Sequence, residues 1–243
     1  MYLVAAARLS DITIIQKNIP LLWRQIRRYN LPVQLALAAA EEIASEADDI
    51  STAAIISLAP CQAGSPELFN WGDAIVSSLN NGFVGNLRMN PIHTLHAVDN
   101  LALSAFAIQH DNHAYGLGLG GSAGQAWCGL ETIYEYFQRN NLNEALLMAG
   151  DQDMVKNSCT ALGIAMLFSY HCRPYQLLKR PVKIINIKRD RLRYFVSPIP
   201  HAADGLSQLL TAIHQHKKRK FLYTVPEKHG NGIEQITIIG ELL

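Results

Sequence analysis

The sequence predicts an α/β fold built in layers, and three observations point to it. Short apolar segments with β-branched residues alternate along the chain with longer segments in which apolar residues recur at helical spacing. Hydrophobic residues make up 49% of the 243 residues, which is enough for a sizeable core. Charged residues make up only 17%, below the usual share of about a quarter, so we expect part of the surface to be covered by a partner.

The predicted strands are short and mostly apolar. The clearest is AAIISLA at residues 53–59, which has a β-branched centre and is closed by Pro60, as expected of a buried strand. The full set of expected strands lies at residues 3–7, 53–59, 115–121, 144–149, 163–170, 182–187, 193–196, 221–225 and 235–239.

The predicted helices lie between these strands. Residues 33–47 are rich in Ala, and residues 65–79 start with Ser65 as N-cap and Pro66 at the first helical position. Small apolar residues indicate a helix within 90–110, and apolar residues at helical spacing indicate two more at 122–140 and 204–215. The basic run KKRK that follows the last helix is interpreted as a solvated helix end.

Composition excludes several classes of function. A net charge of +1 gives no reason to expect binding to nucleic acid or anionic lipid. No apolar run approaches about 18 residues, and residues 1–11 lack the pattern of a signal peptide, so we expect a cytoplasmic protein without a membrane span. The cysteines have no CxxC spacing and are expected to be reduced thiols rather than zinc ligands; they are Cys61, Cys128, Cys159 and Cys172.

Residues 116–121 (GLGLGG) match the string G-x-G-x-x-G of dinucleotide sites. Such a site needs the glycines directly between a strand and a helix, but the preceding HDNH at 110–113 is typical of a loop. The alternation of Gly and Leu favours a strand in close contact with another backbone. We therefore expect no nucleotide cofactor.

Two groups of side chains have the residue types of metal ligands. His93, His96 and Asp99 have compatible spacing, and Asp151 and Asp153 follow a predicted strand. A capped helix start or charge near an interface explains the first group equally well. No metal is expected at either, and the spacing of residues 121–124 does not make the G-x-S-x-G elbow of a hydrolase.

A longer pattern spans residues 90–153: a small-residue helix, a polar turn, a strand, a sharp turn, a helix and a strand that ends in AGDQD. This segment resembles the N-terminal half of the β-ketoacyl synthases, which have the thiolase-like fold. The resemblance implies a layered αβα sheet, in which 151–153 lie in a loop and 115–119 form an edge strand. In these enzymes a nucleophilic Cys lies at the elbow where the strand meets the buried helix.

Aligned without gaps from Ala149 and Gly150, the nucleophile position falls on Gln125, and Cys128 lies three residues further on. An amide cannot form the thioester that condensation requires. Gln at this position resembles the chain-length-factor subunits of type II polyketide synthases, and the stretch GSAGQAWCGL is similar to theirs.

The catalytic histidine motifs of a ketosynthase C-terminal half are also missing. The sequence HGNG at 229–232 resembles these motifs only weakly, and we interpret it as a surface turn. The chain resembles the shortened ketosynthase-like proteins of aryl polyene clusters. We expect one domain, 1–243, in which 1–170 correspond to the N-terminal half and 171–243 are a remnant of the C-terminal half.

The resemblance implies a subunit that is not an enzyme by itself. It would form a heterodimer with a full ketosynthase, which contacts the acyl carrier protein, and it would shape the acyl tunnel for polyketide or fatty-acid-like elongation. The candidate tunnel and interface residues are Phe106, His110, Tyr115, Leu117, Leu119, Trp127 and Leu130. Two alternatives stay open: an enzyme, either a Gln-type malonyl-carrier-protein decarboxylase or an acyl-thioester enzyme that uses Cys128, and a self-associating scaffold that binds an acyl chain.

Overall fold

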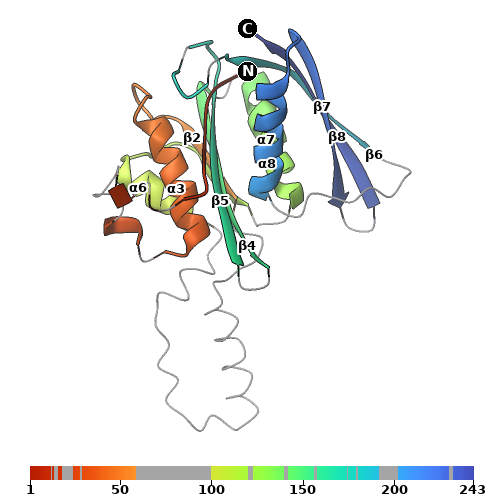
Figure 1. The fold of residues 1–243 in the computed structure, drawn as a ribbon. Helices are drawn as coiled ribbons and strands as arrows, with labels where there is room; N and C mark the ends of the chain where they lie inside the picture. Colours follow the sequence, from red (N-terminus) through yellow and green to blue (C-terminus); the bar gives the residue numbers. More distant parts are fainter. Residues whose placement is uncertain are drawn as a thin grey trace, which may run out of the picture.

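In a computed structural model, the described part of the chain forms a curved sheet with helices on both of its faces (Figure 1). The structure describes residues 1–11, 13, 16–17, 24–27, 29–58, 100–119, 123–139, 142–155, 158–173, 175–178, 180–191, 202–229 and 232–243. The expected helix at 65–79, the expected strand at 193–196 and the group His93, His96 and Asp99 lie outside these residues.

The sheet has eight strands in the order β3-β2-β4-β5-β1-β6-β8-β7. β2 is parallel to both β3 and β4, and the other pairs are antiparallel. Their bounds are β1 Tyr2–Leu9, β2 Ala54–Leu58, β3 Gly116–Leu119, β4 Glu144–Val155, β5 Ser158–Ser169, β6 Val182–Arg191, β7 Lys220–His229 and β8 Gly232–Leu242.

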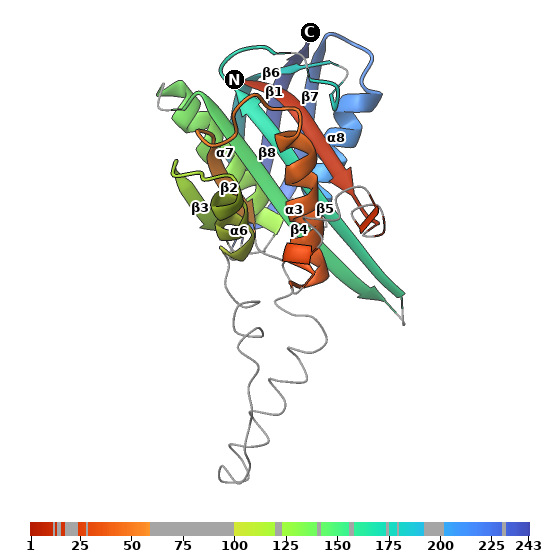
Figure 2. The same ribbon diagram turned by 90° about the vertical axis from the view of Figure 1, so that its left-hand side faces the viewer.

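The helices lie on both faces of the sheet. Their bounds are α3 Leu31–Ala44, α6 Leu101–Gln109, α7 Ala123–Gln138 and α8 Ala202–Gln215. One core cluster joins α7 and α8 to strands from both ends of the sheet, so the sheet curls around these two helices (Figure 1). A second cluster joins α3 and α6 to the opposite face of β1, β2, β4 and β5 (Figure 2). No described helix covers the outer face of β6 and β7, where Ile185 and Leu222 are exposed.

A pair of glycines lets α3 lie directly on the sheet. Gly150 of β4 and Gly163 of β5 are paired across the ladder. A Cβ added at Gly150 would collide with the backbone of Pro32, and one added at Gly163 would collide with the backbone of Leu35. Glycine at both positions therefore sets the distance between helix and sheet.

Most predicted elements are confirmed, and the largest difference concerns β4 and β5. The strand expected to end at Ala149 runs on to Val155, because residues 151–155 pair with 158–162 of β5 in a long hairpin. Asp151 and Asp153 therefore lie in a strand, and the expectation that this stretch is a loop was wrong. The polar residues at the start of the extension, Asp151 to Asp153, hid it from a hydropathy pattern, whereas the backbone pairing with β5 continues through them.

Candidate functional site

The alternating glycines and leucines of β3 lie on opposite faces of the sheet. Leu117 and Leu119 are half-buried and pack against the core that contains α7 and α8. The glycines lie beside α6: a Cβ at Gly118 would stand 3.0 Å from the Cβ of Asn100, and one at Gly116 would stand 3.3 Å from the Leu103 side chain. The close contact predicted from the Gly–Leu pattern is therefore a contact with α6.

β3 lies at the edge of the sheet, as predicted (Figure 2). Among the described strands it pairs only with β2, in parallel register from Ile55–Gly116 to Leu58–Leu119. The backbone groups that point away from β2 have no strand partner in the described part of the chain. An uncovered strand edge of this kind is a ready surface for pairing with another chain.

α6 adds an apolar surface next to this edge. Seven of its nine residues are apolar, yet only Ala102 and Phe106 are buried. Ile108 is 82% exposed, and Tyr115, just before β3, is 41% exposed. Tyr115 places an exposed aromatic ring directly before the open strand, which is typical of a surface that binds another protein. Ile108 lies on another part of α6, where it borders a cleft with Ile26 and Tyr29.

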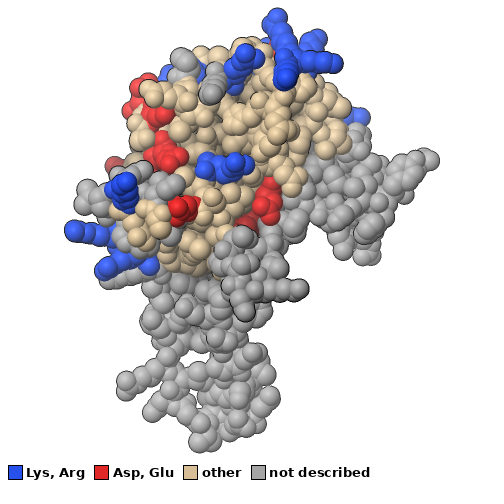
Figure 3. All heavy atoms as spheres, viewed as in Figure 1, with Lys and Arg blue, Asp and Glu red and all other residues tan. Residues whose placement is uncertain are grey.

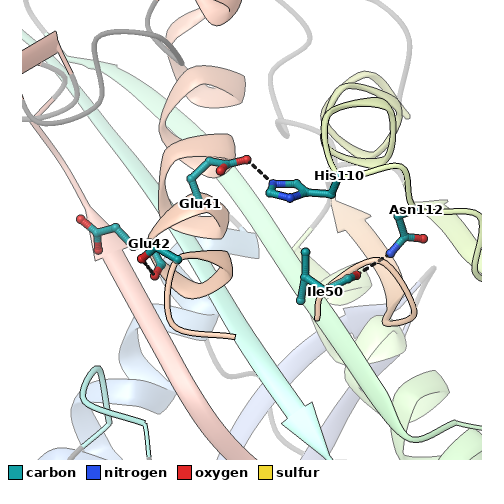
Figure 4. Close-up of polar contacts among 6 residues, drawn as sticks. Glu41, Glu42, Ile50, His110 and Asn112 are labelled. Atoms are coloured by element: carbon teal, nitrogen blue, oxygen red, sulfur yellow. Dashed lines mark hydrogen bonds and ion pairs between the residues drawn. The ribbon is translucent and has the colours of Figure 1, made fainter. Parts of the chain in front are cut away.

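The polar turn between α6 and β3 is held by Asn112, whose side-chain amide forms three hydrogen bonds. The Asn112 amide donates to the carbonyl oxygen of Ile50 at 2.8 Å (Figure 4). It also donates to the carbonyl oxygen of Ala53 at 2.9 Å, and its own oxygen accepts from the Ala114 N–H. Asp111 has a φ of 49°, the left-handed conformation that tight turns require. The HDNH sequence therefore fixes the point at which β3 begins.

Two of the predicted residues, Phe106 and His110, lie together on the α3 side of the sheet. Phe106 is completely buried, and its ring centroid lies 4.4 Å from that of His110. The Nε2 atom of His110 lies 2.7 Å from the Oε1 atom of Glu41 on α3 (Figure 4). This contact joins α6 to α3 and engages one nitrogen of the imidazole ring.

Two others, Trp127 and Leu130, lie on α7, on the opposite face of the sheet. Both are 1% exposed and belong to the core around α7 and α8. A Cβ at Gly205 of α8 would stand 3.1 Å from the Trp127 ring, and the Tyr223 ring centroid lies 6.3 Å from it. The seven predicted residues are thus divided between two core faces and the strand edge.

Gln125 is the third residue of α7, which follows β3 after a short connection. The first N–H groups of a helix have no partner within the helix, and Gln125 lies in this first turn. Cys128, one turn further on, is half-buried. Three described histidine rings form hydrogen bonds. His110 contacts Glu41, His113 contacts Asp111, and His216 contacts the carbonyl oxygen of Lys220.

Tyr115 extends the edge surface toward α7. Its ring centroid lies 5.1 Å from that of Tyr136. A hydrogen bond with Tyr136 raises the pKa of Tyr115, and partial burial raises it further. The Tyr115 phenol is therefore neutral and paired with Tyr136 of α7 at the surface next to β3.

Sequence reasoning missed the role of Asp151. This residue is 3% exposed, and its Oδ2 atom accepts a hydrogen bond of 2.8 Å from the backbone N–H of Ala203. The carboxylate therefore caps the start of α8 from a strand 52 residues away in the sequence.

Among the described residues no group of three His, Cys, Asp or Glu side chains could hold a metal ion. No helix in the described part is long and apolar enough to span a bilayer.

The edge strand, the buried helix that follows it and the layers on either side of the sheet define the class of fold: it is the thiolase-like fold of ketosynthases. No protein-family model matches the sequence, and no curated protein matches it either. The similarity to solved structures is therefore a similarity of fold.

Three solved structures illustrate this similarity. The ishigamide ketosynthase/chain length factor matches with a TM-score of 0.64 at 10% identity, over 100% of this chain and 99% of that one. The ketosynthase ApeO in complex with its chain length factor ApeC, from Xenorhabdus doucetiae, matches with a TM-score of 0.54 at 10% identity, over 88% of this chain and 80% of that one. The AntDE:AntF complex, a type II polyketide synthase carrier protein with its ketosynthase, matches with a TM-score of 0.61 at 8% identity. The match covers 100% of this chain and 99% of that one.

Proposed function

We propose that this protein is a chain-length-factor-like subunit that pairs with a full ketosynthase and does not itself condense acyl chains. The observation that carries the proposal is Gln125 in the first turn of α7, directly after the edge strand. At that position an amide takes the place of the sulfur nucleophile. A protein that has the strand and the helix on either side of this position but lacks the nucleophile has a role in assembly and shape rather than in thioester chemistry.

The open edge of β3 supports the same proposal. Strand pairing across this edge would cover its free backbone groups, and α6 would contribute Ile108 to the same interface. The ketosynthase would supply the cysteine, the histidines and the contact with the acyl carrier protein. This chain would supply one wall of the acyl tunnel, in a pathway that makes aryl polyenes or related polyketides.

The domain assignment follows from the same proposal. The strands β3, β2, β4, β5 and β1 all precede residue 170 and would correspond to the N-terminal half of a ketosynthase. The strands β6, β8 and β7 follow it and would be the remnant of the C-terminal half, in one domain over 1–243. A cytoplasmic location is part of this proposal.

Co-expression with a full ketosynthase tests the pairing. We expect a stable 1:1 complex, measured by light scattering after size exclusion. A homodimer that does not bind the ketosynthase would instead favour a scaffold.

An assay on malonyl-carrier protein tests the absence of catalysis. The isolated chain and its Gln125→Ala variant should both show no decarboxylation, and Gln125→Cys should yield no ketoacyl product. Activity of the isolated chain that disappears in Gln125→Ala would show that it is a decarboxylase, and our proposal would then be wrong.

A further inference from the structure

A cleft of about 680 Å³ lies at the carboxyl end of α8. Its described lining residues come from three segments, namely the turn before β6, the last turn of α8 and the end of β8; they are Gln176, Leu177, Arg180, Ile213, His214, His216, Lys217 and Leu242. This volume is within the range of about 300–1,000 Å³ that is typical of small-molecule sites.

The cleft lies far from the elbow. Gly205, near the start of α8, contacts Trp127 in the first turns of α7, so these two helix starts lie together. His214 is nine residues further along α8, which places the cleft about 14 Å along the helix axis at 1.5 Å per residue. A ligand in this cleft would therefore not occupy the position of Gln125.

The cleft is electropositive. Four of its eight described lining residues are basic or imidazole side chains, and none is Asp or Glu. Lys218, Arg219 and Lys220 follow directly and are exposed, and Figure 3 shows Lys and Arg side chains gathered at this end of the molecule. The carboxyl end of α8 carries roughly half a negative charge, which is less than the two full charges of Arg180 and Lys217.

Two neighbouring carboxylates already have partners, Glu46 in the backbone of the cleft wall and Glu241 on Arg219. Glu46 accepts hydrogen bonds from the backbone N–H groups of Gln176 and Leu177, and Glu241 is paired with Arg219 at 2.5 Å. Among the described residues, no carboxylate forms an ion pair with Arg180 or Lys217, and both side chains line the cleft.

The floor of the cleft is apolar. Ile213 is 3% exposed and Leu242 is 7% exposed, and Leu177 is half-buried beside them. A cleft with a basic rim and an aliphatic floor fits a ligand that has an anionic group joined to an apolar chain. Arg presents a planar fork of N–H donors that matches a phosphate group.

From these observations we propose that the cleft binds a phosphate ester with a short alkyl chain, its phosphate on Arg180 and Lys217 and its chain on Ile213 and Leu242. The imidazoles of His214 and His216 border the same opening. This site is independent of the proposed pairing with a ketosynthase, because neither β3 nor α6 contributes to it.

A titration of the full chain with hexyl phosphate, followed by NMR, tests the proposal. We expect saturable shifts of the backbone amides of Gln176, Arg180 and Lys217, and tighter binding than for inorganic phosphate or hexanol. Arg180→Gln should weaken binding about tenfold, because a charge-assisted hydrogen bond is lost. Lys218→Gln is the matched control: it removes an adjacent exposed charge that does not line the cleft, and should change binding less than about twofold.

Four outcomes would overturn the proposal. They are no saturable binding of hexyl phosphate, equal loss in Arg180→Gln and Lys218→Gln, binding of hexanol as tight as that of hexyl phosphate, and Arg180-dependent binding to phosphatidylglycerol vesicles without binding of the soluble ester. The last would indicate a lipid headgroup on a membrane as the source of the phosphate. Co-purification of the Arg180→Gln variant with the ketosynthase keeps this test separate from that of the proposed function.

Discussion

Replacement of Ile108 by Arg tests whether α6 and the edge of β3 bind the ketosynthase. Ile108 is 82% exposed, so the substitution removes almost no contact within the isolated chain. We expect the free energy of unfolding to change by less than about 0.5 kcal/mol, as for other surface substitutions. The effect should appear in the complex.

The expected effect on the complex can be worked out from the exposed area. Full burial of an Ile side chain stabilises by about 1.5–3 kcal/mol, and most of this is still available at Ile108. Arg at an apolar interface also loses its hydration, which adds a penalty of several kcal/mol unless a carboxylate meets it. A total of at least about 3 kcal/mol corresponds to a loss of affinity of roughly a hundredfold or more.

Leu222→Arg is the matched control, because Leu222 is 66% exposed on β7, the strand at the other end of the sheet. Both variants carry the same new charge at an exposed apolar position. Size exclusion and surface plasmon resonance with the ketosynthase should show that Leu222→Arg binds normally and Ile108→Arg does not. If both bind normally, or if only Leu222→Arg fails, the interface is not at α6 and β3.

Four further predictions concern the fold. Gly163→Ala should lower the free energy of unfolding by about 2–3 kcal/mol, because the new methyl group meets the α3 backbone; Gly116→Ala, which meets only a flexible side chain, should cost less than about 1 kcal/mol in urea titrations. Asp151→Ala should cost about 1–2 kcal/mol through the lost cap of α8, and an unchanged melting temperature would exclude that role. Ser57→Ala should be neutral or slightly stabilising in calorimetry, since its buried hydroxyl has no partner among the described residues; a loss above about 1 kcal/mol would contradict this. Trp127→Ala should cost about 3–5 kcal/mol in thermal unfolding, and longer products at unchanged stability would instead support a role in the tunnel wall.

Local patterns were sufficient to predict the elements that frame the elbow. The Gly–Leu alternation of β3 follows from the two faces of one strand, and α8 follows from apolar residues at helical spacing. The resemblance to ketosynthases placed β3 at an edge, which the strand order confirms. Each of these features depends on residues close together in the sequence or on a pattern already known from related folds.

The features that sequence reasoning missed depend on residues far apart in the sequence. The Asp151 cap of α8 joins residues 52 positions apart, and the contact of His110 with Glu41 joins residues 69 positions apart. The long hairpin of β4 and β5 depends on pairing between two backbones, and the polar residues of the hairpin give no sequence pattern that predicts it. No local pattern distinguishes a polar residue that folds onto a distant partner from one that faces solvent.

Sequence alone also could not divide apolar residues between core and interface. Phe106 and Ile108 lie two positions apart on α6, yet the first is fully buried and the second is 82% exposed. α6 is apolar on every side, so its sequence contains no polar face to show which side meets the sheet. In the fold α6 lies beside the edge strand β3, and its exposed Ile108 borders a cleft with Ile26 and Tyr29. The exposed side chains of Ile185 and Leu222 lie near the other end of the sheet. The low fraction of charged residues fits surfaces at both ends, but only the edge of β3 leads directly into the helix that carries Gln125, so the ketosynthase is expected at that edge.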